Sequence, residues 1–171
     1  MKANLEAFER LKGLEGNWRG RSADGAKEID LRYVIASKRS VVIEFYQHFF
    51  KGQMSDEMVT VYHPSGEDLM LTHYCTLGNQ PRMIADLGAD YLRHLSFKYV
   101  SATNLTHHDC LRMSGVSFRF DDDDHFEQTW YWFGKKCYVD ARHHSDDYDD
   151  LPDDGRPGQD TFLMIRKSAS T

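Results

Sequence analysis

The segment from Leu69 to Met83, LMLTHYCTLGNQPRM, gathers side chains that can bind or activate a ligand. It holds the imidazole of His73, a phenol, a thiol, two amides and the guanidinium of Arg82. An imidazole titrates near neutral pH and can act as an acid, a base or a ligand. Turn residues Gly78 and Asn79 divide the segment, which is typical of two neighbouring strands. We therefore expect a pocket in a sheet protein, and the alternative for His73 is a core histidine bonded to a backbone carbonyl.

Glu44 is a second candidate, because it lies inside the apolar stretch VVIEFYQHFF. A buried carboxylate without a partner costs several kcal/mol or becomes protonated. Arg82 is the nearest cation of the motif, so we predict that Glu44 and Arg82 form a pair beside His73 in one concave site. The alternative is a Glu44 side chain that faces solvent.

Amides and indoles complete the candidate set. Asn79 lies at a tight turn, where asparagine is favoured for positive φ, and Gln80 follows at a position that needs no amide. Trp130 and Trp132 alternate in QTWYWF, so one strand face would carry indoles toward a flat or apolar ligand, or into ordinary core. The lone Cys75 is interpreted as core filling. The candidate ligand-binding residues are therefore Glu44, His73, Asn79, Gln80, Arg82 and Trp130.

The histidines do not form a recognisable metal site in the sequence. His107-His108 and His143-His144 are adjacent pairs, and adjacent side chains on an extended chain point to opposite faces, so neither pair is expected to chelate. Residues 121–124, all aspartate, lack the glycine and glutamate of a calcium-binding EF-hand loop, and we expect a hairpin turn there. We expect no cofactor and no metal. Haem needs one axial histidine and stays open as an alternative, with candidates His48, His63, His73 and His94.

Mostly strands would position these side chains. Apolar residues recur at helical spacing between Leu5 and Leu14, which indicates a short helix capped by Asn4 and ending near Gly13. After it, β-branched and aromatic stretches alternate with turn residues. The expected strands begin at Gly16 and continue at 27–36, 41–50, 57–63, 68–75, 82–87, 93–100, 113–120, 125–133 and 161–167. About ten such strands with short turns predict an all-β, up-and-down antiparallel barrel, because closure removes exposed sheet edges.

Gly16-Asn17-Trp18 after a short helix resembles the first strand of the calycin barrels, which include lipocalins and fatty-acid-binding proteins. The resemblance implies that Trp18 packs against a basic residue of the last strand, where Arg166 stands in FLMIRK. The segment TVYHPSGEDLMLTHYCTLGNQPRM is similar to one in a bacterial group of uncharacterised lipocalin-like domains. The resemblance covers residues 5–133 and 161–167 and implies a small-molecule-binding barrel, without supplying a reaction.

The composition favours one β-barrel domain over residues 1–171, with 40% hydrophobic and 13% aromatic residues. The net charge of −6 comes from the segment 140–160, whose eight aspartates and two arginines we interpret as a flexible, solvated insertion. The remainder is formally neutral, so neither nucleic acid nor a membrane surface is expected as a partner. Three widely spaced cysteines indicate no disulfide framework, and the charged first residues lack an apolar secretory core, so a cytoplasmic protein is expected.

These features predict a lipocalin-like barrel that binds a small apolar or amphipathic molecule through one or two polar anchors. An enzyme of the isomerase or cyclase type is the alternative from another class, with His73 moving a proton and Arg82 holding an anion. Nitrobindin-like haem binding is a further alternative. A purely structural module would instead have an interior plugged by Phe45, Tyr46 and Trp130.

Overall fold

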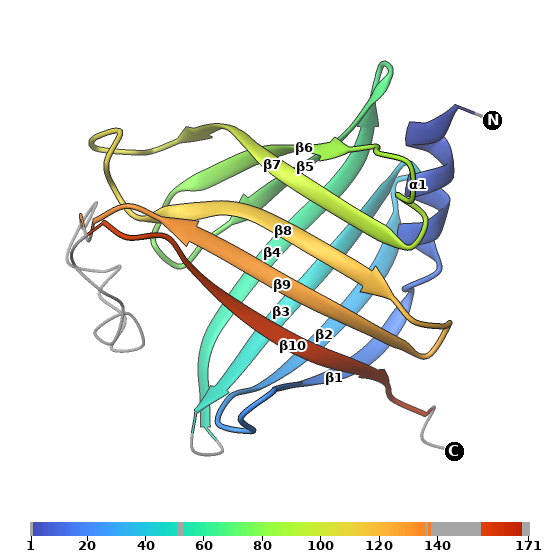
Figure 1. The fold of residues 1–171 in the computed structure, drawn as a ribbon, viewed down its shortest axis with the longest axis horizontal. Coiled ribbons are helices and arrows are strands. Elements are labelled where there is room, and N and C mark those ends of the chain that lie inside the picture. Colours follow the sequence, from blue (N-terminus) through green and yellow to red (C-terminus); the bar gives the residue numbers. More distant parts are fainter. Residues whose placement is uncertain (1, 51–52, 136, 138–154, 169–171) are drawn as a thin grey trace.

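The computed structural model describes residues 2–50, 53–135, 137 and 155–168. In this part of the chain the expected short helix is followed by the expected ten strands (Figure 1). The elements are α1 Ala3–Lys12, β1 Gly16–Ser22, β2 Glu28–Ala36, β3 Val41–Phe50, β4 Gln53–Ser65, β5 Asp68–Tyr74, β6 Gln80–Asp86, β7 His94–Thr103, β8 Arg112–Phe120, β9 His125–Phe133 and β10 Gly158–Arg166.

Each strand pairs antiparallel with its neighbours in sequence, and β1 pairs with β10 to close the barrel. The predicted all-β, up-and-down barrel is therefore confirmed. Short turns explain this order, because they return the chain directly beside the strand just completed. In the β8–β9 turn the Asp122 carboxylate accepts the backbone N–H of Asp124 at 2.7 Å, so the aspartate run forms the expected hairpin turn.

Helix α1 covers one end of the barrel, beside the β4–β5 turn (Figure 1). Asn4 does not cap this helix, contrary to the prediction, because the N-cap position is Lys2. The buried Asn4 amide instead donates to the carbonyl oxygens of Gly66 at 3.2 Å and Asp68 at 3.3 Å. Asn4 thus ties the helix to the barrel end, a long-range role that helical spacing does not reveal.

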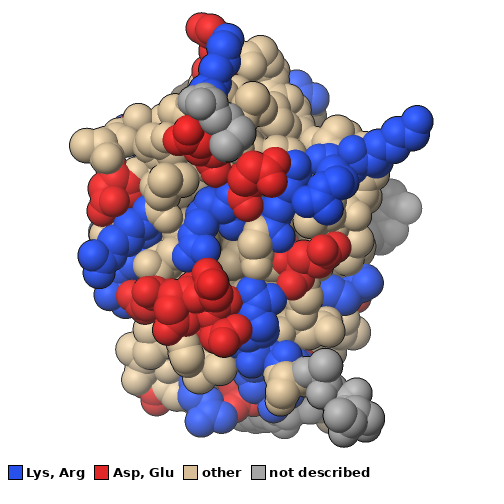
Figure 2. Space-filling model, turned by 90° about the vertical axis from the view of Figure 1, so that its right-hand side faces the viewer, with Lys and Arg blue, Asp and Glu red and all other residues tan. Residues whose placement is uncertain are grey.

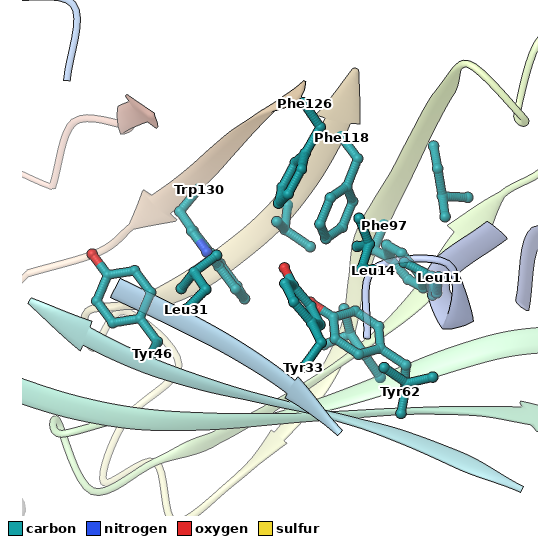
Figure 3. Close-up of a cluster of buried hydrophobic side chains, with 14 of the residues drawn as sticks. Leu11, Leu14, Leu31, Tyr33, Tyr46, Tyr62, Phe97, Phe118, Phe126 and Trp130 are labelled. Atoms are coloured by element: carbon teal, nitrogen blue, oxygen red, sulfur yellow. The ribbon is translucent and has the colours of Figure 1, made fainter. Parts of the chain in front are cut away.

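Side chains fill the half of the barrel nearer to α1 (Figure 3). Aromatic rings meet edge to face there: the centroids of Tyr62 and Phe97 lie 5.6 Å apart, and those of Trp18 and Phe126 lie 4.7 Å apart. Such packing adds to the free energy of burial. In the other half, Trp130 and Tyr46 lie apart from this group of rings, so the described interior is filled at one end only.

The plug expected for a purely structural module is therefore incomplete. Phe45 points outward, where the guanidinium of Arg32 lies 4.3 Å from its ring centroid. Strand alternation accounts for this, because its neighbours Glu44 and Tyr46 in β3 are the ones that point inward. Tyr46 and Trp130 do enter the barrel, but they line a cavity rather than fill the space.

The contact between the first and last strands is confirmed. Trp18 and Arg166 face each other across β1 and β10, and the guanidinium lies 4.2 Å from the indole. Arg166 also donates to the backbone carbonyls of Gly13, Glu15 and Asp123, each at 2.8 Å. One side chain thus joins the strand seam, the end of α1 and the β8–β9 turn.

Replacing Arg166 by alanine should lower the free energy of unfolding by about 2 kcal/mol, because a cation–π contact and the bonds to three carbonyls are lost. Urea unfolding monitored by circular dichroism measures this change. Arg119→Ala is the control, since Arg119 forms exposed ion pairs with Asp121 and Glu127, and it should change stability by less than about 0.5 kcal/mol. Equal effects of the two substitutions would contradict the assigned role of Arg166.

Cys110 and Cys137 form a disulfide, with their Cα atoms 5.1 Å apart. The wide spacing of the cysteines did not predict this pair, whereas Cys75 is free and buried, as expected. The β8–β9 hairpin returns the chain to the same place, where backbone N–H groups of Leu111 and Lys135 donate to the carbonyls of Lys135 and Asp109, both at 2.7 Å. Disulfides persist mainly in oxidising compartments, so the cysteines no longer support a cytoplasmic location.

Charged side chains of both signs share the surface. On the face at the α1 end, Lys and Arg lie among Asp and Glu (Figure 2), and ion pairs there include Arg10 with Asp123 at 3.3 Å. Among the described residues, no helix has both the length and the apolar character needed to cross a membrane. Strand β10 begins at Gly158, within the segment 140–160 that we predicted to be an insertion, and residues 138–154 lie outside the described residues.

Candidate ligand-binding site

A cavity of about 80 Å³ opens at the end of the barrel away from α1, where β2, β4, β8 and β10 begin and β3, β5 and β9 end. An engineered cavity of about 150 Å³ holds benzene, so this one encloses a group of a few non-hydrogen atoms, and a larger ligand would extend through the mouth. Its polar lining residues are Lys27, His48, Asp56, His73 and Asp160. Its aromatic and apolar walls include Tyr46, Met58, Leu111, Met113, Trp130, Trp132 and Phe162.

A row of four polar side chains crosses the interior behind this cavity. The strand register places Tyr33 opposite Glu44, Glu44 opposite Thr60, and Thr60 opposite His73, on β2 to β5. Directly paired residues of neighbouring strands point to the same face of the sheet, and all four are buried. At the cavity end of the row, Thr60 Oγ1 and His73 Nδ1 share a hydrogen bond of 2.9 Å.

Glu44 is held by neutral donors. Its Oε2 atom accepts hydrogen bonds from the Tyr33 hydroxyl at 2.6 Å, the Tyr62 hydroxyl at 2.9 Å and the Gln128 amide at 2.9 Å. Burial raises the pKa of the Glu44 carboxyl, and the hydrogen bonds oppose that rise. Burial raises the pKa of Tyr33 and Tyr62 well above its ordinary value, so both phenols remain protonated donors.

His73 forms a buried wall of the cavity, with 1% of its surface exposed. Burial lowers the pKa of its imidazole to about 3, because the charged form would lose its hydration, so the ring is neutral at physiological pH. Its ring centroid lies 4.6 Å from that of Trp130 on β9. The imidazole is therefore fixed from two sides, by Thr60 and by Trp130.

The cavity wall includes buried ring nitrogens that have no hydrogen-bond partner among the described residues. Nε2 of His73 and Nε1 of both Trp130 and Trp132 are of this kind. A buried polar atom left unpaired costs about 1 to 3 kcal/mol, so such atoms are rare in native interiors and are commonly satisfied by water or a ligand. An apolar cavity with a few polar atoms is the usual form of a small-molecule site.

The mouth of the cavity carries charged groups. Lys27 Nζ contacts the Asp160 carboxylate at 2.7 Å, and Asp56 lies in the same lining with 8% exposure. The lysine charge is thus already paired. The described charged groups at the mouth therefore favour neutral ligands over anions.

Arg82 does not pair with Glu44. Strand β6 directs Pro81 and Met83 inward, whereas Arg82 is exposed and faces Thr72 on the outer surface. The predicted convergence of three residues is therefore wrong for Arg82. Glu44 and His73 both point into the barrel, but of the two only His73 lines the cavity. An exposed Arg82 cannot hold an anion at this cavity.

The side chains of Asn79 and Gln80 form hydrogen bonds that hold neighbouring loops together. The Asn79 amide donates to the Leu111 carbonyl at 3.0 Å, and the Gln80 amide donates to the Gly78 carbonyl at 2.9 Å while its oxygen accepts from Thr103. Positive φ belongs to Gly78, at 79°, rather than to Asn79. Neither amide is among the residues that line the cavity.

Of the four strand histidines, His48 and His73 line the cavity, whereas His94 is exposed and His63 contacts the Pro64 carbonyl. The enclosed volume of about 80 Å³ is too small to hold a porphyrin, so haem would have to lie mostly outside the cavity.

His107 and His108 lie in a loop with their ring centroids 4.1 Å apart, and with Asp109 they bring ligand atoms within 4.8 Å of one another. We had expected these adjacent side chains to point to opposite faces of an extended chain and therefore not to chelate. That expectation is wrong for His107 and His108. All three side chains are exposed, and such groups are common without an ion, so we assign them no metal. His143 and His144 lie outside the described residues.

Sequence reasoning missed Tyr33, Thr60, Tyr62 and Gln128 as partners of the polar row. A signal for two of them was present, because Thr60 and Tyr62 alternate with Val61 in β4 and share the inward face with Met58. Gln128 carried no comparable signal, since it reaches Glu44 from the opposite side of the closed barrel, 84 residues away in sequence.

Neither the family models nor the curated proteins compared with this chain contain a match. Among solved structures, the chain is similar to EF1p2_mFAP2b bound to DFHBI, with a TM-score of 0.45 and 10% identity over 94% of this chain and 98% of that one. It is also similar to a redesigned beta barrel, b11L5F_LGL, with a TM-score of 0.39 and 8% identity over 93% and 95% of the two chains. At these scores neither likeness bears on function, and the barrel assignment rests on the strand pairing of this chain itself.

Proposed function

We propose that this chain is a calycin-like barrel that binds a small, largely apolar molecule in the mouth cavity, with His73 and Trp130 as its polar anchors. The observation that carries the proposal is that ring nitrogens of His73, Trp130 and Trp132 are buried without a described partner at a cavity walled mainly by aromatic and apolar side chains. A core built for stability alone would avoid such atoms, whereas a binding site uses a few fixed polar groups to orient its ligand.

Binding is favoured over proton transfer. A general base works best when its pKa lies near the operating pH, and burial holds the pKa of His73 at about 3. A proton taken up by this imidazole would be lost again at once at neutral pH. The exposed Arg82 also removes the anion-holding residue that the isomerase or cyclase alternative required.

Screening a small-molecule library by thermal shift tests the proposal, because a ligand that binds the folded state alone raises the melting temperature. A compound that contacts the cavity should also change the fluorescence of Trp130 and Trp132. A library of small neutral and charged compounds that yields no hit by either readout would refute the proposal.

Gly158→Ala should weaken binding of a screened hit at least about tenfold, because it reshapes the cavity wall. A Cβ atom at Gly158 would lie 2.5 Å from Nε1 of Trp132, so the indole would have to move. Calorimetric titration measures the loss. Gly88→Ala is the matched control, since a Cβ there meets nothing within 4 Å, and its affinity should equal that of the wild type. Unchanged binding by Gly158→Ala would show that Trp132 does not shape the site.

A further inference from the structure

We propose that the buried end of the cavity selects a neutral hydroxyl or amide group on an otherwise apolar ligand, with His73 Nε2 accepting a hydrogen bond and the Trp130 indole donating one. This inference rests on the proposed function and names the chemical class of its ligand. It depends on which nitrogen of His73 carries the proton and on which charges lie nearby.

The proton of His73 is assigned by its neighbour Thr60. The Thr60 hydroxyl has one proton, and it lies between His73 Nδ1, at 2.9 Å, and Glu44 on the adjacent strand, whose Oε1 atom is buried without a described partner. Its proton is assigned to that side of the row, because Glu44 lies directly opposite Thr60 on β3 and its buried Oε1 atom otherwise lacks a donor. Thr60 Oγ1 therefore accepts from Nδ1–H of His73, and the lone pair of Nε2 is left for the cavity.

The indoles have the opposite hydrogen-bonding role, because they donate where His73 Nε2 accepts. An indole nitrogen can only donate, and Nε1 of Trp130 and of Trp132 is buried without a described partner. Trp130 stands beside His73, with ring centroids 4.6 Å apart, so an acceptor and a donor flank the same cavity. A single hydroxyl satisfies both, since it donates one hydrogen bond and accepts others, and an amide does so with its N–H and C=O groups.

Other polar groups match less well. Ethers and ketones accept but cannot donate, so they would leave His73 Nε2 unpaired. A carboxylate likewise has no proton to donate, and it would approach Asp56 and Asp160 at a mouth where Lys27 is already paired. An ammonium group can donate to His73 but has no lone pair, so it would leave the indole N–H of Trp130 unpaired.

Calorimetric titration of the wild type at pH 7 with 4-ethylphenol, 4-ethylanisole and 4-ethylbenzoate tests the selection. The three probes share one apolar body and differ in the group that meets His73. We expect the phenol to bind at least about tenfold more tightly than the ether or the carboxylate, because each of these leaves an unpaired acceptor. In His73→Phe, which keeps a ring beside Trp130, the preference for phenol over ether should fall below about threefold.

The outcomes separate this inference from the proposed function. If none of the probes and no screened compound binds, the proposed function fails. If the ether or the carboxylate binds as tightly as the phenol, the cavity binds ligands but the selection proposed here is overturned.

Nitrogen NMR of the ligand-free protein tests the same inference without a ligand or a variant. Selective ¹⁵N-histidine labelling should show His73 protonated at Nδ1 and unprotonated at Nε2 near pH 7. A signal from the tautomer with Nε2 protonated would overturn the assignment of His73 as an acceptor.

Discussion

The wild type should be more stable than a His73→Gln variant at pH 7, and lowering the pH to 4.5 should reduce this advantage by about 2 to 3 kcal/mol. The pKa of His73 falls from 6.5 to about 3 on folding because the ring is buried. Below pH 6.5 the unfolded chain binds a proton at this residue that the folded protein rejects until the pH approaches 3. The wild type therefore loses stability as the pH falls through this window, and glutamine, which does not titrate, removes that loss.

Urea unfolding of both proteins at several pH values between 7 and 4.5 measures this effect. At pH 7 the wild type should be the more stable, because glutamine loses the contact of the ring with Trp130. The same substitution at the exposed His94 is the control and should change the stability at pH 7 by less than about 0.5 kcal/mol. If the free energies of unfolding of the wild type and His73→Gln change in parallel with pH, folding does not lower the pKa of His73. The imidazole would then be hydrated in the folded protein.

Glu44→Ala should destabilise the protein by about 3 to 5 kcal/mol, because three buried donors lose their common acceptor and a cavity is left in their midst. Those donors are the hydroxyls of Tyr33 and Tyr62 and the amide of Gln128. Glu57→Ala on the neighbouring strand is the matched control, since Glu57 is exposed, and its effect should stay within about 0.5 kcal/mol. A similar effect of the two substitutions in chemical unfolding would contradict the network.

The isosteric Glu44→Gln reports on the charge of this carboxyl. Burial raises its pKa above the ordinary 4.5, so ionisation disfavours the folded state. The stability that the wild type gains from a protonated Glu44 is complete below about pH 4.5 and is lost as the pH rises through the folded-state pKa. The advantage of the wild type over Glu44→Gln should therefore shrink with rising pH, in the direction opposite to the His73 effect. An advantage that grows with pH would show a carboxylate stabilised by its donors.

The alternation of side chains explains why the predicted pairing of Arg82 with Glu44 was wrong. His73 shares the inward face of β5 with Leu69 and Leu71, whereas Arg82 pairs with Thr72 on the outer face. The strand period of two is enough to place Arg82 and His73 on opposite faces of the sheet once Arg82 is aligned with Thr72. Closeness within the motif was the misleading feature, because two residues of one hairpin can point to opposite sides of the sheet.

The sequence by itself determined the helix, the ten strands and their order, because these follow from local periodicity and from turn residues at short spacing. The tertiary structure alone decided what Glu44 and His73 meet. The register of β2 to β5 aligns Tyr33, Glu44, Thr60 and His73, and barrel closure brings Gln128 from β9 to the same carboxylate. A strand pattern fixes which face a side chain takes, but its neighbours depend on register and curvature, which arise from the packing of the whole barrel.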